Sequence, residues 1–206
     1  FSKNEVGYKN LLNIISSAYM NHKENAYVDI EQLYKNKEGL LVLSGGNNSI
    51  LKYSNGNSIT SQSASFVADF KKEFIDNFYI EIQRIEGNDY RIDEEVILNL
   101  AYDNNIPVVA TNDVYFEGPD HFEAHDALMC IEKKLFVSQK DRKRLSKNHY
   151  FKSQNEMQEL FSDIPEALFN TIEIAQRCSH RPKIKMPVLP SYYCLLYTSP
   201  SPRDRV

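Results

Sequence analysis

The segment from Ile106 to Phe116, IPVVATNDVYF, constrains the fold of this chain more than any other. Its short apolar run leads directly into a polar end, a pattern typical of a parallel strand that is buried on both faces. In α/β barrels and open α/β sheets, ligands and metals bind at the carboxyl ends of such strands. The segment therefore predicts a strand that places Asp113 at the functional edge of a sheet. Tyr115, two residues later, points to the same side of the strand as Asp113.

Helical and strand-like patterns alternate through the first part of the chain. Amphipathic spacing predicts helices over residues 5–20, 30–37, 61–74 and 93–104. Residues 40–43, 78–83 and the segment from 106 have the composition of buried strands. Short connections between alternating helices and strands indicate an α/β fold, with a parallel sheet covered by helices.

After Phe116 the pattern becomes helical, over residues 120–132, 154–161 and 165–178. Pro165 suits the first turn of the last of these helices. We therefore expect an α/β body over residues 1–118 and a helical extension over 119–190. Residues 191–206 stand apart, because CLLYTSPSPRD resembles translated adapter or vector sequence. The alternative is a genuine flexible tail.

The composition is typical of an ordinary globular domain and argues against a membrane-spanning protein. Of 206 residues, 42% are hydrophobic and 25% are charged, and no apolar run reaches the roughly 18–20 residues of a membrane span. The three cysteines are widely spaced and form no CxxC motif, which favours a reducing compartment and a cytoplasmic location. The chain begins with Phe1, so we expect a fragment of a longer protein.

One short segment is strongly basic although the net charge is −4. Residues 140–147, KDRKRLSK, contain five cationic side chains: Lys140, Arg142, Lys143, Arg144 and Lys147. Such a run is either a solvated loop or a patch that contacts nucleic-acid phosphates. The sequence leaves both interpretations open.

The strand ends carry few groups suited to catalysis. A hydrolytic metal site needs three or more protein donors, whereas these ends offer only Glu81 and Asp113 and no histidine. His121 and His125 are four residues apart on a predicted helix, so they could bind a metal or serve in capping and packing. Dinucleotide-binding, P-loop and serine-hydrolase motifs are absent from the sequence.

Six sequence blocks, taken in order, resemble one known family: NEVGYKNLLNIISSAY, LLVLSGG, FYIEIQR, IPVVATNDVYF, HDALMCI and DIPEALFNTIEIAQRC. The family is the alpha subunits of the bacterial replicative DNA polymerase III, in their N-terminal polymerase and histidinol phosphatase (PHP) domain. The resemblance spans about Asn4 to Pro190. It implies an irregular (β/α)7 barrel, here incomplete, whose first strands with a His-x-His motif would precede Phe1.

The resemblance also implies a function for the parent protein. That protein would be a DNA-directed DNA polymerase that uses magnesium and replicates chromosomal DNA. Its palm, with the catalytic aspartates, would follow Pro190, so this fragment would hold no polymerase site and no catalytic residue. The implied partners are the proofreading exonuclease subunit, other replicase subunits and DNA. The resemblance implies no association with a membrane.

The family's metal motif carries over poorly to this sequence. Family members with an intact site have Cys where this chain has Gly46, and His where it has Ile85 and Tyr115. Glu81 and Asp113 remain as vestigial positions. Because glycine and isoleucine offer no donor and neutral tyrosine is a poor one, we expect no metal and a scaffold or docking role.

Two alternatives remain open beside this hypothesis. One is a metal-dependent phosphoesterase or 3′–5′ exonuclease of the same fold. The other is an unrelated α/β protein whose similarity to the family is accidental.

Overall fold

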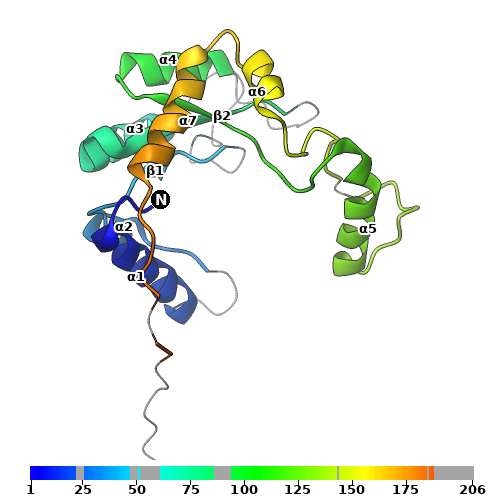
Figure 1. Cartoon of the computed structure of the whole chain (residues 1–206), viewed down its shortest axis with the longest axis horizontal. Helices are drawn as coiled ribbons and strands as arrows, with labels where there is room; N and C mark the ends of the chain where they lie inside the picture. The colour runs from blue at the N-terminus through cyan, green and yellow to red at the C-terminus, as the bar shows by residue number, and fades with distance from the viewer. Residues whose placement is uncertain are drawn as a thin grey trace, which may run out of the picture.

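A parallel three-stranded sheet forms the centre of the protein (Figure 1). The computed structural model describes residues 1–21, 26–46, 51, 61–85, 94–142, 144–184 and 186–187. Strands β1 (Val42–Leu43), β2 (Phe78–Gln83) and β3 (Val108–Thr111) lie in the order β1-β2-β3, and Ile80 pairs with Val108. The predicted parallel α/β sheet is thus confirmed. The (β/α)7 barrel is not confirmed, because the described residues contain only these strands.

The helices lie where the apolar periodicity predicts them, with ends shifted by at most two residues. They are α1 (Glu5–Asn21), α2 (Ile30–Lys35), α3 (Ser61–Phe74), α4 (Glu94–Asp103), α5 (Phe122–Lys133), α6 (Gln154–Leu160) and α7 (Pro165–Arg177). Short 3-10 turns, η2 (Ile75–Asn77) and η3 (Pro119–His121), precede β2 and α5. A helix long and apolar enough to cross a membrane is not found in the described part of the chain.

The first predicted strand, over residues 40–43, is shorter than expected. Leu40 forms an antiparallel bridge with Ser2. The Leu41 backbone N–H donates to the Phe1 carbonyl at 2.9 Å, and the Phe1 amino group donates to the Leu41 carbonyl at 2.7 Å. These residues therefore pair with the start of the chain, and only Val42–Leu43 joins β2.

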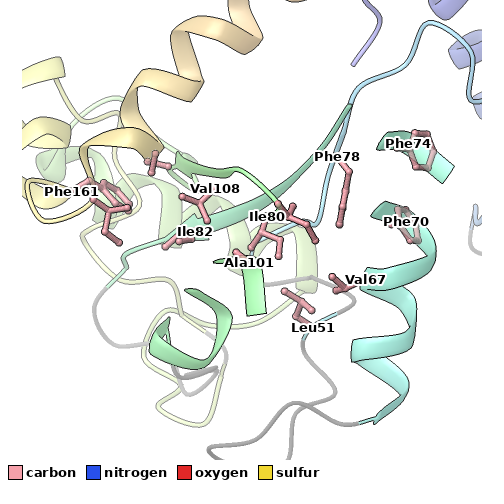
Figure 2. Close-up of a cluster of buried hydrophobic side chains, with 14 residues drawn as sticks. Leu51, Val67, Phe70, Phe74, Phe78, Ile80, Ile82, Ala101, Val108 and Phe161 are labelled. Carbon is pink, nitrogen blue, oxygen red and sulfur yellow. The ribbon is translucent and has the colours of Figure 1, made fainter. Parts of the chain in front are cut away.

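Alternating side chains of β2 pack on opposite faces of the sheet. Phe78, Ile80 and Ile82 face the main core, where they meet α3, α4 and the α6–α7 turn (Figure 2). Tyr79 faces the other way, in a smaller cluster that includes Val109. The next residues on this second face are polar, which brings the functional groups of β2 to the carboxyl end of the sheet.

Helix α7 protects the outer edge of β3. A parallel strand at the end of a sheet directs alternate carbonyls away from its neighbour, and each needs another donor. Asn170 of α7 supplies one, since its Nδ2 donates to the Val108 carbonyl at 2.7 Å. Asn170 lies in the middle of α7, and at its C-terminal end Arg177 Nη1 donates to the Tyr79 hydroxyl at 2.6 Å. The helix is thus anchored to both β2 and β3.

A long excursion leaves the sheet after β3 and carries α5 away from the other helices (Figure 1). We call residues 117–148 the α5 arm. Its two ends are joined at a neck, where Phe116 and Tyr150 form a parallel bridge. The Tyr115 N–H donates to the His149 carbonyl at 2.9 Å, and the Phe151 N–H donates to the Phe116 carbonyl at 3.0 Å. The arm therefore starts and ends beside the carboxyl end of β3.

Arg84, just after β2, ties the sheet to α4 and to the α6–α7 turn. Its guanidinium makes a bidentate pair with Asp163, at 2.6 Å for both bonds, and a second pair with Glu94, at 2.5 and 3.0 Å. It also donates to the Leu160 carbonyl and lies 4.8 Å from the centre of the Phe161 ring. The hydrogen bonds that Arg84 donates to Asp163 and Glu94 raise the pKa of Arg84 above its ordinary value.

We expect Arg84→Lys to lower the free energy of unfolding by about 1–3 kcal/mol, because an ammonium cannot form two planar bidentate pairs. Urea denaturation followed by circular dichroism measures the change. The control is Arg181→Lys at an exposed position, where the effect should stay within about 0.5 kcal/mol. Equal effects at the two positions would refute the linking role of Arg84.

Candidate functional site

The carboxyl ends of the three strands bring together part of the predicted site. Ser44 follows β1, and its Oγ accepts a hydrogen bond from the Glu81 backbone N–H at 3.0 Å. Gln83, at the end of β2, is paired in register with Thr111 at the end of β3. Glu81, Gln83 and Thr111 therefore lie on one face of the sheet, beyond Tyr79 and Val109.

Hydrogen bonds among these side chains converge on one oxygen of the Glu81 carboxylate, Oε1. Gln83 Nε2 donates to Glu81 Oε1 at 3.1 Å and to Thr111 Oγ1 at 3.1 Å. The Thr111 hydroxyl in turn donates to Glu81 Oε1. Glu81 is thus held by two neutral donors, one from its own strand and one from β3.

Gly46 lies against the Gln83 side chain. A Cβ atom at position 46 would be 2.0 Å from both Cδ and Oε1 of Gln83, far inside van der Waals contact. The Gln83 amide therefore occupies the space into which a larger residue at position 46 would project. Sequence reasoning identified Gly46 as a lost ligand position but did not identify Gln83 as the group that fills the space beside it.

The remaining positions that the sequence predicts to be vestigial differ in their surroundings. Ile85 is half-buried and offers only hydrocarbon. The Asp113 side chain is 33% exposed, and Tyr115 is 49% exposed at the neck of the α5 arm. The Tyr115 ring meets the rings of His125 and His149 edge-on, at centroid distances of 5.7 and 5.5 Å. Asp113 and Tyr115 thus belong to the neck, whereas Glu81 belongs to the strand network.

These residues do not fit a transition-metal site. Gly46 and Ile85 supply no donor atom, Tyr115 makes ring contacts, and the Glu81 carboxylate accepts two hydrogen bonds. Across the described residues, no group of three or more His, Cys, Asp or Glu side chains is placed to hold a metal ion.

His149 is the neighbour of Asp113 that sequence reasoning missed. Its side chain is almost fully buried, and Nδ1 lies 3.0 Å from the Asp113 carbonyl and 3.7 Å from Asp113 Oδ2. Nε2 is buried without a hydrogen-bond partner in the described part of the protein. The two residues are 36 positions apart, so no local pattern indicates the contact.

The two histidines of the HxxxH pattern have different surroundings. His121 is exposed at the end of η3, just before α5. His125 lies in α5 and packs against Tyr115 and, at 5.5 Å between centroids, against Phe116. Of the roles considered for these histidines, His125 therefore has the packing role.

Much of the basic segment packs against α5. Arg142 is buried and pairs bidentately with the buried Asp126, with 2.6 Å between Nη2 and Oδ2. Arg144 Nη2 lies 3.1 Å from Asp126 Oδ2, and its guanidinium lies 5.1 Å from the Phe122 ring centre.

The lysines of this segment differ from Arg142. Lys147 is exposed and lies 6.0 Å from the Phe122 ring centre, and Lys140 is exposed. Lys143 falls outside the described residues, as does the predicted tail 191–206.

The buried Asp126–Arg142 pair sets a pH dependence. The hydrogen bond from Arg142 lowers the pKa of Asp126 below its ordinary value of 3.8. A carboxyl group whose pKa is lower in the folded state stabilises the fold above the unfolded pKa. That contribution is lost as the pH falls through the lower, folded-state value.

We therefore expect Asp126→Asn to destabilise the protein at neutral pH, and the difference from wild type to shrink as the pH falls below about 3.8. Urea denaturation at a series of pH values measures the difference. The control, Asp141→Asn, changes an exposed residue of the same segment and should have little effect at any pH. A difference that is constant with pH would contradict the ion pair.

Comparison with known proteins finds a matching domain family and similar proteins. Residues 1–85 match the PHP domain. DNA polymerase III subunit alpha of Caulobacter vibrioides is 39% identical over 193 residues, covering 93% of this chain and 17% of the relative. The corresponding proteins of Rickettsia bellii and Pasteurella multocida are 34% and 38% identical, over 93% and 86% of this chain and 16% of each relative.

The chain spans about one sixth of the length of these relatives. The matches agree with the resemblance seen in the sequence blocks. By sequence, the chain is therefore similar to an N-terminal, PHP-containing segment of DNA polymerase III alpha subunits.

Proposed function

We propose that this chain is the PHP region of a replicative DNA polymerase, and that the region is a catalytically silent scaffold with a degenerate metal site. The observation that carries the proposal is the arrangement at the strand ends. There, Gln83 fills the space beside Gly46, and Glu81 Oε1 accepts hydrogen bonds from Gln83 and Thr111. One carboxylate oxygen is thus engaged in the strand network, while Gly46 and Ile85 supply no donor atom.

The packing around the strand ends supports a scaffold role. The sheet has a well-packed core on one face, α7 anchored along its edge, and Arg84 linking it to α4 and to the α6–α7 turn. Such a body can support neighbouring domains without chemistry of its own. A metal-dependent phosphoesterase or 3′–5′ exonuclease is the competing function. It would need at least three donors around an open position.

The activity of the parent protein is part of this proposal. The relatives are named as DNA polymerase III alpha subunits, which supports a DNA-directed DNA polymerase in chromosomal replication. Its magnesium would be held by aspartates that lie outside this chain. The parent protein would act in the cytoplasm. The proposed partners are other replicase subunits and the proofreading exonuclease, which would dock on the PHP scaffold. Sedimentation velocity on a mixture of the purified chain and exonuclease tests that docking.

We expect the purified chain to retain well below one equivalent of zinc or manganese after incubation with the metal and buffer exchange. Mass spectrometry of the metal content measures this. Asp113→Ala and Glu81→Ala should leave the metal content unchanged, because neither residue is expected to ligate. Stoichiometric metal that is lost in Asp113→Ala, together with phosphodiester hydrolysis, would support the phosphoesterase instead.

The basic segment supports a second, smaller proposal, that its exposed cations contact DNA phosphates. Lys140, Arg144 and Lys147 are the exposed members among its described residues, whereas Arg142 is engaged with the buried Asp126. Each lost phosphate contact weakens binding and reduces the salt dependence of affinity by about one counterion.

We expect Lys140→Ala and Lys147→Ala to lower duplex affinity and each to reduce the slope of log affinity against log salt by about 1. Fluorescence anisotropy on the chain at several salt concentrations measures both quantities. Lys35→Ala, an exposed change on α2, is the control. Slopes identical in all variants would show that the segment is only a solvated loop.

A further inference from the structure

One face of α5 is apolar and exposed, and the function proposed above does not account for it. We propose that this face is an interface, which another part of the same polypeptide covers in the parent polymerase. It rests on the proposed function, because it needs a longer parent protein. It adds that the α5 arm is a contact between the PHP region and the rest of that protein.

The other face of α5 is already covered within the arm. Phe122, Asp126 and Cys130 are buried and follow one another at four-residue spacing, so they share one side of the helix. Asp126 pairs there with Arg142 and with Arg144 of the basic segment. The returning half of the arm therefore packs on this side and leaves the opposite side of α5 free.

The free side carries a stripe of apolar residues. Ala124, Leu128 and Ile131 are four and three residues apart, which places them together on the helix, and all three are exposed. Leu128 is 63% and Ile131 73% exposed. Phe136 and Val137, just after the helix, are exposed as well. We call Ala124, Leu128 and Ile131 the α5 stripe.

A helix with apolar residues on both faces is normally buried on both. In this chain α5 lies apart from the other helices (Figure 1), and the α5 stripe is left facing solvent. Contiguous apolar surface of this kind marks an interaction site. The stripe is therefore suited to packing against an apolar surface that is absent from the described part of the chain.

The chemistry of the stripe favours a permanent cover. It contains no charged side chain, and interfaces that stay closed are more apolar than those between partners that dissociate. A separate subunit would leave the stripe exposed until assembly, whereas a tethered segment is present at high effective concentration as soon as it folds. These properties favour a segment of the same polypeptide.

The length of the relatives supplies such a segment. This chain spans about one sixth of their length, so about five sixths of a parent of that length lies outside it. The exposed Lys133 and Lys134 end the helix beside the stripe. We therefore expect the covering surface to have an apolar centre with acidic side chains at its edge.

Photo-crosslinking in the full-length parent polymerase, purified alone, tests which surface covers the stripe. The photoreactive residue p-benzoylphenylalanine replaces Ile131, and mass spectrometry of the digested protein locates the cross-linked peptide. We expect a cross-link within one polypeptide, to a peptide outside the region of residues 1–190. Four results would overturn the interface: a cross-link to a second copy, one that forms only after the exonuclease is added, one confined to residues 1–190, or none.

Thiol labelling of the same full-length protein measures the cover with a smaller substitution. We expect Ile131→Cys to react with a maleimide at least about tenfold more slowly than Glu132→Cys, because reaction at a covered site requires local opening. Glu132 is the matched control, since it is the next residue of α5, exposed and outside the stripe. Tandem mass spectrometry separates both labels from the buried Cys130. Equal rates in the native protein would contradict the interface.

These outcomes are separate from those that test the degenerate metal site. Stoichiometric zinc in the unaltered chain would overturn the degenerate site and leave the interface standing. An uncovered α5 stripe would remove the interface and leave the metal content of the chain unchanged.

Discussion

The parallel pairing of β2 with both of its neighbours is the constraint on which the rest of the structure depends. Its register brings Gln83 opposite Thr111 and Glu81 opposite Val109. Because side chains alternate along a strand, the same register sends Phe78, Ile80 and Ile82 into the main core. A shift by one residue would bury Glu81 and Gln83 in that core and expose the apolar side chains. Core packing and site geometry are therefore set by one pairing.

On the proposed degenerate site, the strand ends would keep the framework of a metal site without its chemistry. A buried or half-buried carboxylate needs compensation, from a metal or from hydrogen-bond donors. At Glu81 the compensation comes from Gln83 and Thr111. The same hydrogen bonds that stabilise the carboxylate engage its Oε1 atom. If the region is a scaffold, as proposed, these hydrogen bonds stabilise the sheet.

In the α5 arm, charged side chains are likewise engaged by partners within the protein. Read as sequence, KDRKRLSK is a candidate phosphate-binding patch. In the structure Arg142 is paired with Asp126, and Arg144 lies between Asp126 and Phe122, so part of the positive charge stabilises the arm. A count of cationic residues therefore overestimates the charge available to a partner. The two ends of this arm meet at the neck, next to Asp113 and Tyr115.

Local periodicity was enough to predict the helices, the three strands and their parallel arrangement, because apolar spacing is a property of neighbouring residues. It also placed Glu81 and Asp113 near strand ends, and the family blocks marked Gly46, Ile85 and Tyr115. The partners of these residues could not be predicted in this way. These partners come from distant parts of the chain: Gln83 contacts Gly46, His149 contacts Asp113, and Arg142 pairs with Asp126. Only strand register and the path of the α5 arm bring such residues together, so the tertiary structure decided what surrounds each group of the site.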